Sequence, residues 1–337
     1  MRAANVNDVR SELAGPGQEW RDLDLDQLRQ SLVQLDLAVS AGLTKEQSRF
    51  CALYSINFEE RLTGVDHALG YCQSGDYRLA IHVFQCRAAS GNLLLLHGLY
   101  DHSGLYRHLI EYGLQRNMNV VIFDMPGHGL STGEPFGIES FGDYRHAIAD
   151  VLRACDFLSG SWSVLAQSNG AAALIEYTLT SGLKPFDRVV LLAPLIRPRG
   201  WWWIRAGHVL LHRLLDTVPR SLSTSSSDPE FLRFLHQDPL QIPTTAVSWV
   251  GALRRWLAHI EGCVSIESDW MLIQGTDDST VDWQYNIPHI QKLFPGSRVE
   301  YIEGARHQLA NESTTIRQRC LHLVSEYLDA GGATADD

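Results

Sequence analysis

The sequence predicts an α/β fold, with an open and mostly parallel central sheet that carries helices on both faces. Three observations support this prediction. Short apolar runs recur along the chain, amphipathic segments separate them, and a long helical stretch interrupts the alternation once. Such alternation is typical of parallel sheets, because a crossover between parallel strands needs a connection long enough to form a helix.

The first 65 residues differ from the remainder of the chain. Their apolar residues recur at helical spacing, as in Leu25, Leu28, Leu32 and Leu35, and strand signals are few. We interpret residues 1–65 as an N-terminal helical extension packed on the main domain, with a surface for a partner as the alternative. No group of side chains in it indicates catalysis.

Residues 66–196 and 266–337 carry the alternation and form the predicted core. We expect seven strands there, several of them continuous apolar runs typical of strands buried on both faces. They are Tyr77–Phe84, Leu93–Leu96, Val120–Phe123, Ser163–Ala166, Val189–Leu192, Trp270–Ile273 and Val299–Ile302. Amphipathic helices are expected between them, at Tyr106–Leu114, Tyr144–Leu158 and Ile287–Phe294.

Residues 197–265 interrupt the alternation and are predicted to form a helical cap over the carboxyl ends of the strands. Trp201, Trp202 and Trp203 begin an amphipathic helix that we expect to continue to Val218. Its apolar face packs over the core, lines a substrate pocket or rests on a membrane surface. The three tryptophans are the candidate pocket residues, although three adjacent indoles cannot all face inward on one helix.

Composition argues against some classes of function. Apolar residues make up 45% and charged residues 20% of the 337 residues, which is typical of a globular enzyme. A formal net charge of −11 argues against a nucleic-acid partner, because phosphate binding needs clustered Lys and Arg. The six cysteines have no CxxC or metal-ligand spacing, so we expect free thiols in a reducing, cytoplasmic compartment. The N-terminal sequence lacks the apolar segment of a secretory signal, and no run approaches the roughly 18 apolar residues that cross a bilayer.

A predicted strand runs directly into Ser168, and a helix of small residues, Gly170 to Ala173, leaves it at once. This context is typical of a nucleophile elbow, a tight turn that lifts a serine hydroxyl above the sheet. The usual pattern is G-x-S-x-G, and Ala166 stands here in place of the first glycine. The alternative is that Ser168 only caps the following helix.

The loop after the second predicted strand begins with His97, Gly98 and Leu99. In folds of this kind, this loop and the residue after the nucleophile each donate a backbone N–H to the oxyanion of a tetrahedral intermediate. Leu99 and Asn169 are therefore the candidate oxyanion donors. Gly98 allows the chain to approach the substrate carbonyl closely, and His97 is expected to have a structural role.

Three aspartates follow the sixth predicted strand, at Asp277, Asp278 and Asp282. Asp278, three residues after Gly275, is the predicted acid of a catalytic triad. Asp277 is the alternative, and Asp282 is expected to cap the helix that follows.

His307 lies after the last predicted strand, ahead of a terminal helix. From there its Nε2 can accept the proton of Ser168 while Asp278 holds Nδ1–H. The order Ser, Asp, His, with each residue at a strand end, predicts a serine hydrolase with these three catalytic residues. No metal or organic cofactor is implied.

Five motifs in the core and one in the cap form a wider pattern: His97–Ser103, Asp124–Ser131, the turn around Ser168, Gly275–Asp278, Gly304–His307 and Asp238–Leu240. From about residue 68 onward, this pattern resembles the monoacylglycerol lipase and lysophospholipase group of α/β-hydrolases. The resemblance implies the α/β-hydrolase fold, a cap over the site, and a carboxylic ester substrate with an acyl chain. The departures are Ala166 for glycine, Asp101 for the more usual glutamate, and the unmatched N-terminal 65 residues.

Two alternatives to ester hydrolysis remain open at this point. The fold also hosts amide and peptide hydrolases, including aminopeptidases, and ligand-binding receptors built on the same scaffold. Turnover, rather than binding, separates the receptor from the enzymes. We expect a small acyl ester or lipid as substrate, no nucleic acid, and peripheral membrane contact through the cap.

Overall fold

The structure, a computed structural model, describes residues 23–220 and 225–330. Its central sheet has eight strands in the order β1-β2-β4-β3-β5-β6-β9-β10. Strand β2 pairs antiparallel with β1 and β4, and the other pairs are parallel, which confirms the predicted sheet. The strands are β1 (Val65–Ser74), β2 (Tyr77–Cys86), β3 (Asn92–Leu96), β4 (Asn119–Phe123), β5 (Trp162–Gln167), β6 (Arg188–Leu192), β9 (Met271–Gly275) and β10 (Arg298–Ile302).

All seven predicted strands are present, and β1 is the strand of this sheet that the sequence analysis missed. It pairs with β2 along its whole length, from Val65 opposite Cys86 to Ser74 opposite Tyr77. Strand β1 lies at the edge of the sheet, and polar residues flank its apolar centre, which a glycine, Gly70, interrupts. Pairing with its neighbour, rather than local pattern, makes this segment a strand.

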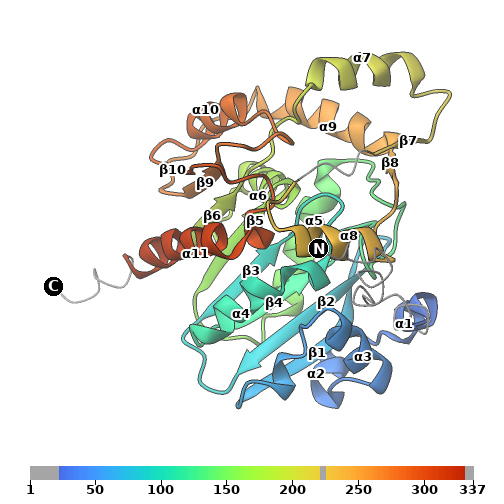
Figure 1. Ribbon diagram of the computed structural model, residues 1–337, viewed down its shortest axis with the longest axis vertical. Coiled ribbons are helices and arrows are strands. Elements are labelled where there is room, and N and C mark those ends of the chain that lie inside the picture. Colours follow the sequence, from blue (N-terminus) through green and yellow to red (C-terminus); the bar gives the residue numbers. More distant parts are fainter. Residues whose placement is uncertain (1–22, 221–224, 331–337) are drawn as a thin grey trace, which may run out of the picture.

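Helices cover both faces of the sheet and divide the core in two (Figure 1). Along β3, Leu94 and Leu96 face one layer while Leu93 and Leu95 face the other. The first layer contains α5 (Phe141–Ala154), α6 (Asn169–Ser181) and α10 (Trp283–Leu293). The second contains α4 (Arg107–Gln115) and α11 (Thr314–Asp329).

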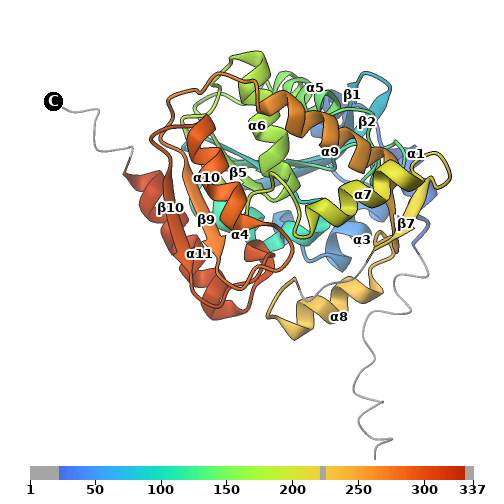
Figure 2. The same cartoon turned by 90° about the horizontal axis from the view of Figure 1, so that it is seen from above.

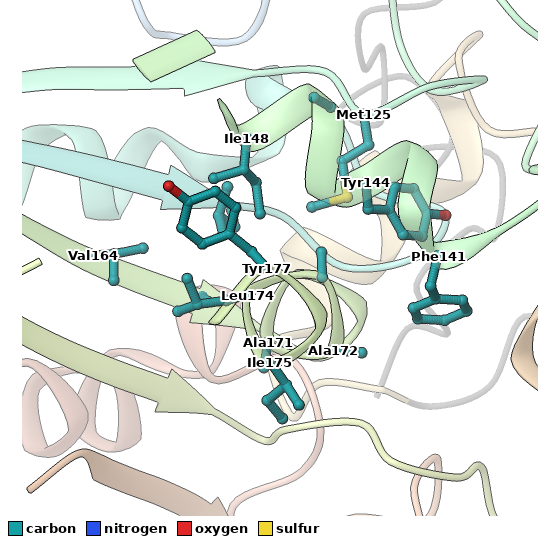
Figure 3. Packing of buried hydrophobic residues seen from close by; sticks show 14 of the residues in the cluster. Met125, Phe141, Tyr144, Ile148, Val164, Ala171, Ala172, Leu174, Ile175 and Tyr177 are labelled. Carbon is teal, nitrogen blue, oxygen red and sulfur yellow. The ribbon is translucent and has the colours of Figure 1, made fainter. Parts of the chain in front are cut away.

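Helix α6 packs closely against the sheet where it leaves β5. A Cβ atom at Gly170 would lie 2.4 Å from the carbonyl oxygen of Leu96, so no larger residue fits there. Ala171 continues this small-residue surface, and Tyr144 of α5 and Met125 lie in the same packed layer (Figure 3). This close approach permits the sharp turn between β5 and α6.

The described part of the N-terminal extension is helical, as expected. It contains α1 (Leu25–Ser31), α2 (Leu35–Ala41), α3 (Lys45–Leu53) and a short 3-10 helix η1 (Phe58–Glu60). These helices lie beside the β1–β2 hairpin, with α2 on one face of the sheet and α3 on the other (Figure 1). Residues 1–22 of the predicted extension lie outside the described residues.

The cap, residues 197–265, differs from its prediction in two ways. It contains α7 (Trp201–Leu211), β7 (Thr217–Pro219), α8 (Pro229–Gln237), β8 (Thr244–Ala246) and α9 (Val247–Ile260). The helix expected to reach Val218 ends at Leu211, and Val218 instead pairs with Thr245 in a small antiparallel sheet that was not predicted. Helix α7 packs against α9 on the outside of the molecule, at the top of Figure 1, and Figure 2 shows the same pair of helices from above. Within the described chain, no helix is both long and apolar enough to cross a membrane.

Candidate active site

Ser168 occupies the sharp turn between β5 and α6. Its φ of 53° and ψ of −113° lie in a region that L-residues rarely adopt, so the turn is strained. The Ser168 side chain makes no capping hydrogen bond to α6 in the described structure. The geometry therefore corresponds to a nucleophile elbow rather than to a helix cap.

The structure brings Ser168, His307 and Asp278 together from three separate loops. His307 Nε2 lies 2.9 Å from Ser168 Oγ, and His307 Nδ1 lies 2.8 Å from Asp278 Oδ2. All three side chains are buried. Since a carboxylate only accepts, Nδ1–H donates to Asp278 and leaves Nε2 as the acceptor for the serine hydroxyl. This is the hydrogen-bonding order of a serine hydrolase triad.

Neighbouring groups hold the Asp278 carboxylate in place and keep it ionised. Its Oδ1 accepts the N–H groups of Thr280 at 2.8 Å and Val281 at 3.2 Å, and its Oδ2 accepts Gln274 Nε2 at 3.1 Å. Burial would raise the pKa of Asp278, but His307 and these hydrogen bonds hold it below its ordinary value.

The interaction between Asp278 and His307 raises the pKa of the imidazole, whereas it lowers the pKa of the carboxylate. Burial alone would lower the pKa of His307, but the negative charge of Asp278, with a smaller contribution from Asp101, raises it above its ordinary value. The imidazolium formed when His307 accepts the serine proton is thereby stabilised.

The carboxylates of the two other candidate aspartates do not bond to His307 in the described structure. The backbone N–H of Asp277 donates to Ala305 O at 2.9 Å, and it is Asp278 that bonds to His307. Asp282 stands at the N-cap position, directly before the first residue of α10, but its carboxylate makes no capping hydrogen bond. It binds Arg197 instead, at 2.8 Å from Nε and 2.6 Å from Nη2. The predicted capping role of the Asp282 side chain is therefore wrong, because a cation from the cap competes for it.

The predicted oxyanion residues flank the nucleophile. Asn169 is the first residue of α6, where backbone N–H groups and the helix dipole favour negative charge, and Leu99 lines the cavity at Ser168. A Cβ atom at Gly98 would lie 3.4 Å from Ser168 Cβ, which shows how closely this loop passes the nucleophile. His97 is buried, and its Nε2 accepts Met125 N–H at 2.9 Å, as a structural histidine does.

A hydrogen-bond network that the sequence analysis missed supports this loop. Tyr106 Oη accepts Gly98 N–H at 3.0 Å and donates to Asp101 Oδ2 at 3.1 Å. Gln308 Nε2 donates to Asp101 Oδ1 at 2.9 Å. Burial raises the pKa of Asp101. Gln308 directly follows the catalytic His307, and this position in the sequence could have indicated that its side chain belongs to a network at the site.

A cavity of about 330 Å³ opens on Ser168 and His307. Apolar side chains from the cap form much of its wall: Ile204, Val218, Leu235, Trp249 and Val250. The three candidate pocket residues Trp201, Trp202 and Trp203 do not line it. Trp201 is buried in the core, whereas Trp202 and Trp203 are 65% and 83% exposed. Successive residues of a helix point about 100° apart, so the three indoles do not share one face, and the residue of α7 that lines the cavity is Ile204.

Arg220 adds a positive charge to the same cavity. Its Nη2 donates to Gln241 Oε1 at 2.6 Å, and its guanidinium carbon lies 4.3 Å from the Tyr100 ring centroid. Its Nε and Nη1 are buried without a hydrogen-bond partner among the described residues. The hydrogen-bonding capacity of these two nitrogens is therefore unused among the described residues.

Comparison with known proteins agrees with this geometry. Residues 87–314, more than half of the chain, match the family model Hydrolase_4, described as serine aminopeptidase, S33. Human monoglyceride lipase is 25% identical over 263 residues, which cover 72% of this chain and 84% of that protein.

Two solved structures share the fold. The monoacylglycerol lipase of Paleococcus ferrophilus has a TM-score of 0.64 and 21% identity, with 74% of this chain and 98% of that chain covered. A soluble variant of the Saccharomyces cerevisiae monoglyceride lipase, in complex with a substrate analogue, has a TM-score of 0.67 and 16% identity over 78% and 94% of the two chains. The chain thus has the α/β-hydrolase fold, is similar to monoglyceride lipases, and belongs to the Hydrolase_4 family.

Proposed function

We propose that the chain hydrolyses esters of a single acyl chain, such as monoacylglycerols, through an acyl-enzyme on Ser168. The observation that carries this proposal is the Ser168–His307–Asp278 relay at the floor of a cavity with an apolar wall from the cap. The monoglyceride lipases among its relatives support the same substrate class.

In the first half-reaction, Ser168 Oγ attacks the ester carbonyl carbon while its proton moves to His307 Nε2. The oxyanion lies against the backbone N–H groups of Leu99 and Asn169, and losing one such donor typically costs about 10²–10³ in rate. The tetrahedral intermediate collapses, the ester C–O bond breaks, and His307 returns the proton to the leaving alcohol. Asp278 stabilises the imidazolium between these two transfers.

In the second half-reaction, water attacks the acyl-enzyme. His307 accepts a proton from the water, and the resulting oxyanion uses the same two amides. When the intermediate collapses, the proton passes to Ser168 Oγ and the free acid leaves. Both halves need the same relay, so removal of Ser168 or His307 blocks turnover.

Ser168→Ala tests the nucleophile, with Ser225→Ala as its control because Ser225 lines the same cavity. Both variants and the unaltered chain would be assayed on monoacylglycerols and on aryl esters of short to long acyl chain. We expect turnover to disappear in Ser168→Ala and to persist in Ser225→Ala, and the chain-length optimum to reflect the cavity.

Other results would point to the alternatives. A folded chain that cleaves aminoacyl arylamides but no ester would be a peptidase. A folded chain that binds an acyl ester without turnover would be a receptor. Ser168→Ala with unchanged ester hydrolysis would remove Ser168 as the nucleophile.

A lysophospholipid is a second candidate substrate, favoured by Arg220. A phosphate oxygen is a strong acceptor for a guanidinium group, and two N–H groups of Arg220 have no partner in the described structure. Arg220→Gln should then lower kcat/KM for a lysophosphatidic acid more than for a monoacylglycerol with the same acyl chain. If Arg220→Gln lowered kcat/KM equally for both substrates, the neutral glycerol head group of a monoacylglycerol would be favoured.

Peripheral membrane contact through the cap is supported by exposed apolar residues on α7 and just after it. They are Trp202, Trp203, Val209, Leu210, Leu211, Leu214 and Leu215. An amphipathic helix with exposed indoles is typical of proteins that lie on a lipid surface. The cytoplasmic location stays a prediction.

A further inference from the structure

Three buried metal-ligating side chains meet outside the part of the chain that matches the family model. Cys51 belongs to α3, His67 to β1 and His82 to β2. One ligand atom from each lies within 4.8 Å of the other two, and no other group of this kind occurs among residues 23–220 and 225–330. The cluster lies between the N-terminal extension and the edge of the sheet.

The hairpin register brings the two histidines to one face. His67 pairs with Phe84 and His82 pairs with Leu69, so the two imidazoles stand diagonally opposite each other on the same side of the sheet. Helix α3 covers this side and buries Cys51 completely. The meeting of the three side chains follows from strand register and helix packing.

The hydrogen bonds prepare the imidazoles as ligands. His67 Nδ1 lies 3.0 Å from Glu59 Oε2 and donates to it, which leaves the lone pair on His67 Nε2. This Nε2 accepts His82 Nδ1–H at 3.0 Å. When a metal ion takes the place of this hydrogen bond, the proton of His82 Nδ1 moves to His82 Nε2, which is buried without a partner among the described residues. A carboxylate behind a histidine is the usual outer partner of a zinc ligand, because it fixes the ring and raises its basicity.

We propose that Cys51, His67 and His82 bind a Zn²⁺ ion, with Glu59 holding His67 from behind. Thiolate sulfur and imidazole nitrogen are both ligand types that zinc prefers, and these three side chains leave the fourth tetrahedral position to a water molecule. The thiol proton leaves to solvent when the ion binds, and the charges of the Cys51 thiolate and the Glu59 carboxylate then balance the ion. Zinc–nitrogen bonds of about 2.0–2.1 Å place tetrahedral nitrogens about 3.3 Å apart, so the His67–His82 pair needs to open by only a few tenths of an ångström.

The site is structural, because it ties the extension to the β1–β2 hairpin and contains no residue of the triad. Tyr54 follows α3 directly, and its hydroxyl donates to Asp238 Oδ1 in the cap at 2.7 Å. An ion at Cys51 therefore fixes the helix that leads to this contact. Its loss should loosen the extension without removing any catalytic group.

Cobalt reports on this site because Co²⁺ takes the same ligands and gives a sulfur-to-metal absorption band only with a thiolate ligand. The full chain without a polyhistidine tag would be titrated with Co²⁺ and then with Zn²⁺. Cys263→Ser is the control, because Cys263 is half-buried and its Sγ lies 3.8 Å from His259 Nε2, which makes it the competing site for added metal. We expect one Co²⁺ per chain with the band in the unaltered chain and in Cys263→Ser, its displacement by Zn²⁺, and a higher Tm with Zn²⁺.

Two variants complete the test. Cys51→Ala should lose the band and the Zn²⁺-dependent rise in Tm. Glu59→Gln keeps all three ligands and should weaken Zn²⁺ binding about 10–100-fold, the usual cost of losing such an outer partner. If Cys51→Ala does not fold, the cobalt band in Cys263→Ser and the affinity of Glu59→Gln decide. A missing band in the unaltered chain, a band lost in Cys263→Ser, or a band retained in Cys51→Ala would overturn the proposal.

Discussion

Among single residues, Asp278 illustrates how orientation and charge combine. Two backbone N–H groups, from Thr280 and Val281, hold its Oδ1, so the carboxylate presents Oδ2 to His307 in a fixed direction. An amide at this position could donate to His307 Nδ1 and stabilise the wrong tautomer, in which Nε2 carries the proton. The role of Asp278 thus requires a carboxylate, and an amide in the same position would not replace it.

Asp278→Asn should accordingly lower kcat about 10⁴-fold on a water-soluble aryl ester, as the wrong tautomer does in other serine hydrolases. Asp277→Asn is the matched control, one residue earlier in the same loop, and should retain nearly full activity. Steady-state kinetics on both variants check this. A larger loss in Asp277→Asn than in Asp278→Asn would assign the triad acid to Asp277.

The pH dependence of activity should follow His307. Only the neutral imidazole accepts the serine proton, and Asp278 outweighs burial and raises the pKa of His307 above its ordinary value. As pH falls through this raised pKa, kcat/KM should fall with it, so the acid limb should lie above the ordinary histidine value of about 6.5. A pH profile of kcat/KM on an uncharged aryl ester measures the limb. A limb at or below about pH 6.5 would contradict the assignment.

Among the helices and strands, α7 has an amphipathic sequence whose apolar face is not buried. Its apolar residues have helical spacing, but the face that they form points to solvent: Trp203 is 83% exposed and Leu210 is 76% exposed. These two residues are seven positions apart and therefore lie on one face of the helix. A water-exposed apolar face of this kind favours an interface with lipid.

The double substitution of Trp203 and Leu210 by serine should weaken binding to phospholipid vesicles by about tenfold or more, since each side chain would otherwise bury apolar area in the lipid. Hydrolysis of a water-soluble ester should be unchanged, because neither residue lines the cavity at Ser168. Vesicle co-sedimentation and an ester assay measure the two effects. Leu183→Ser, at a residue 58% exposed on the loop after α6, serves as the control. If the unaltered chain, the double variant and Leu183→Ser bound vesicles equally, the cap would not be the part of the chain that contacts the membrane.

For the whole molecule, one buried cluster joins three parts of the chain. Asp238 of the cap accepts Tyr54 Oη of the extension at 2.7 Å and His102 Nε2, from the loop after β3, at 2.8 Å. Burial would raise the pKa of Asp238, but His102 and Tyr54 hold it below its ordinary value. The extension, the cap and the core thus meet at one ionised carboxylate.

Tyr54→Phe removes a hydrogen bond to a buried charge and should lower the free energy of unfolding by about 1.5–3 kcal/mol near neutral pH. Because the folded-state pKa of Asp238 is depressed, this contribution is present above the ordinary carboxyl pKa and is lost as pH falls through the lower folded value. Urea denaturation at several pH values measures it.

Tyr112→Phe is the matched control, because its hydroxyl bonds the neutral Ser325 Oγ at 2.9 Å within the core layers. It should cost less, about 0.5–1.5 kcal/mol, with little dependence on acid pH. If the two variants lost the same stability at every pH, the charge of Asp238 would have no part in holding the extension to the cap.

The elements that the sequence predicted correctly are those that a local pattern of apolar and polar residues identifies. Strands buried on both faces, such as Leu93–Leu96, are continuous apolar runs and were recognised, whereas the edge strand Val65–Ser74 mixes polar and apolar residues and was not. The end of α7 at Leu211 was missed because the strand containing Val218 depends on pairing with Thr245, a residue distant in the chain.

By itself the sequence determined the parallel sheet and the order of Ser168, Asp278 and His307 at strand ends, because the carboxyl ends of parallel strands share one edge of a sheet. Only the tertiary structure decided which side chains surround that edge. The bond between Gln308 and Asp101 joins residues 207 positions apart, and the exposed indoles of α7 depend on how that helix lies. The physical reason is that backbone preference and burial period are local properties, whereas contacts between distant side chains are set by packing.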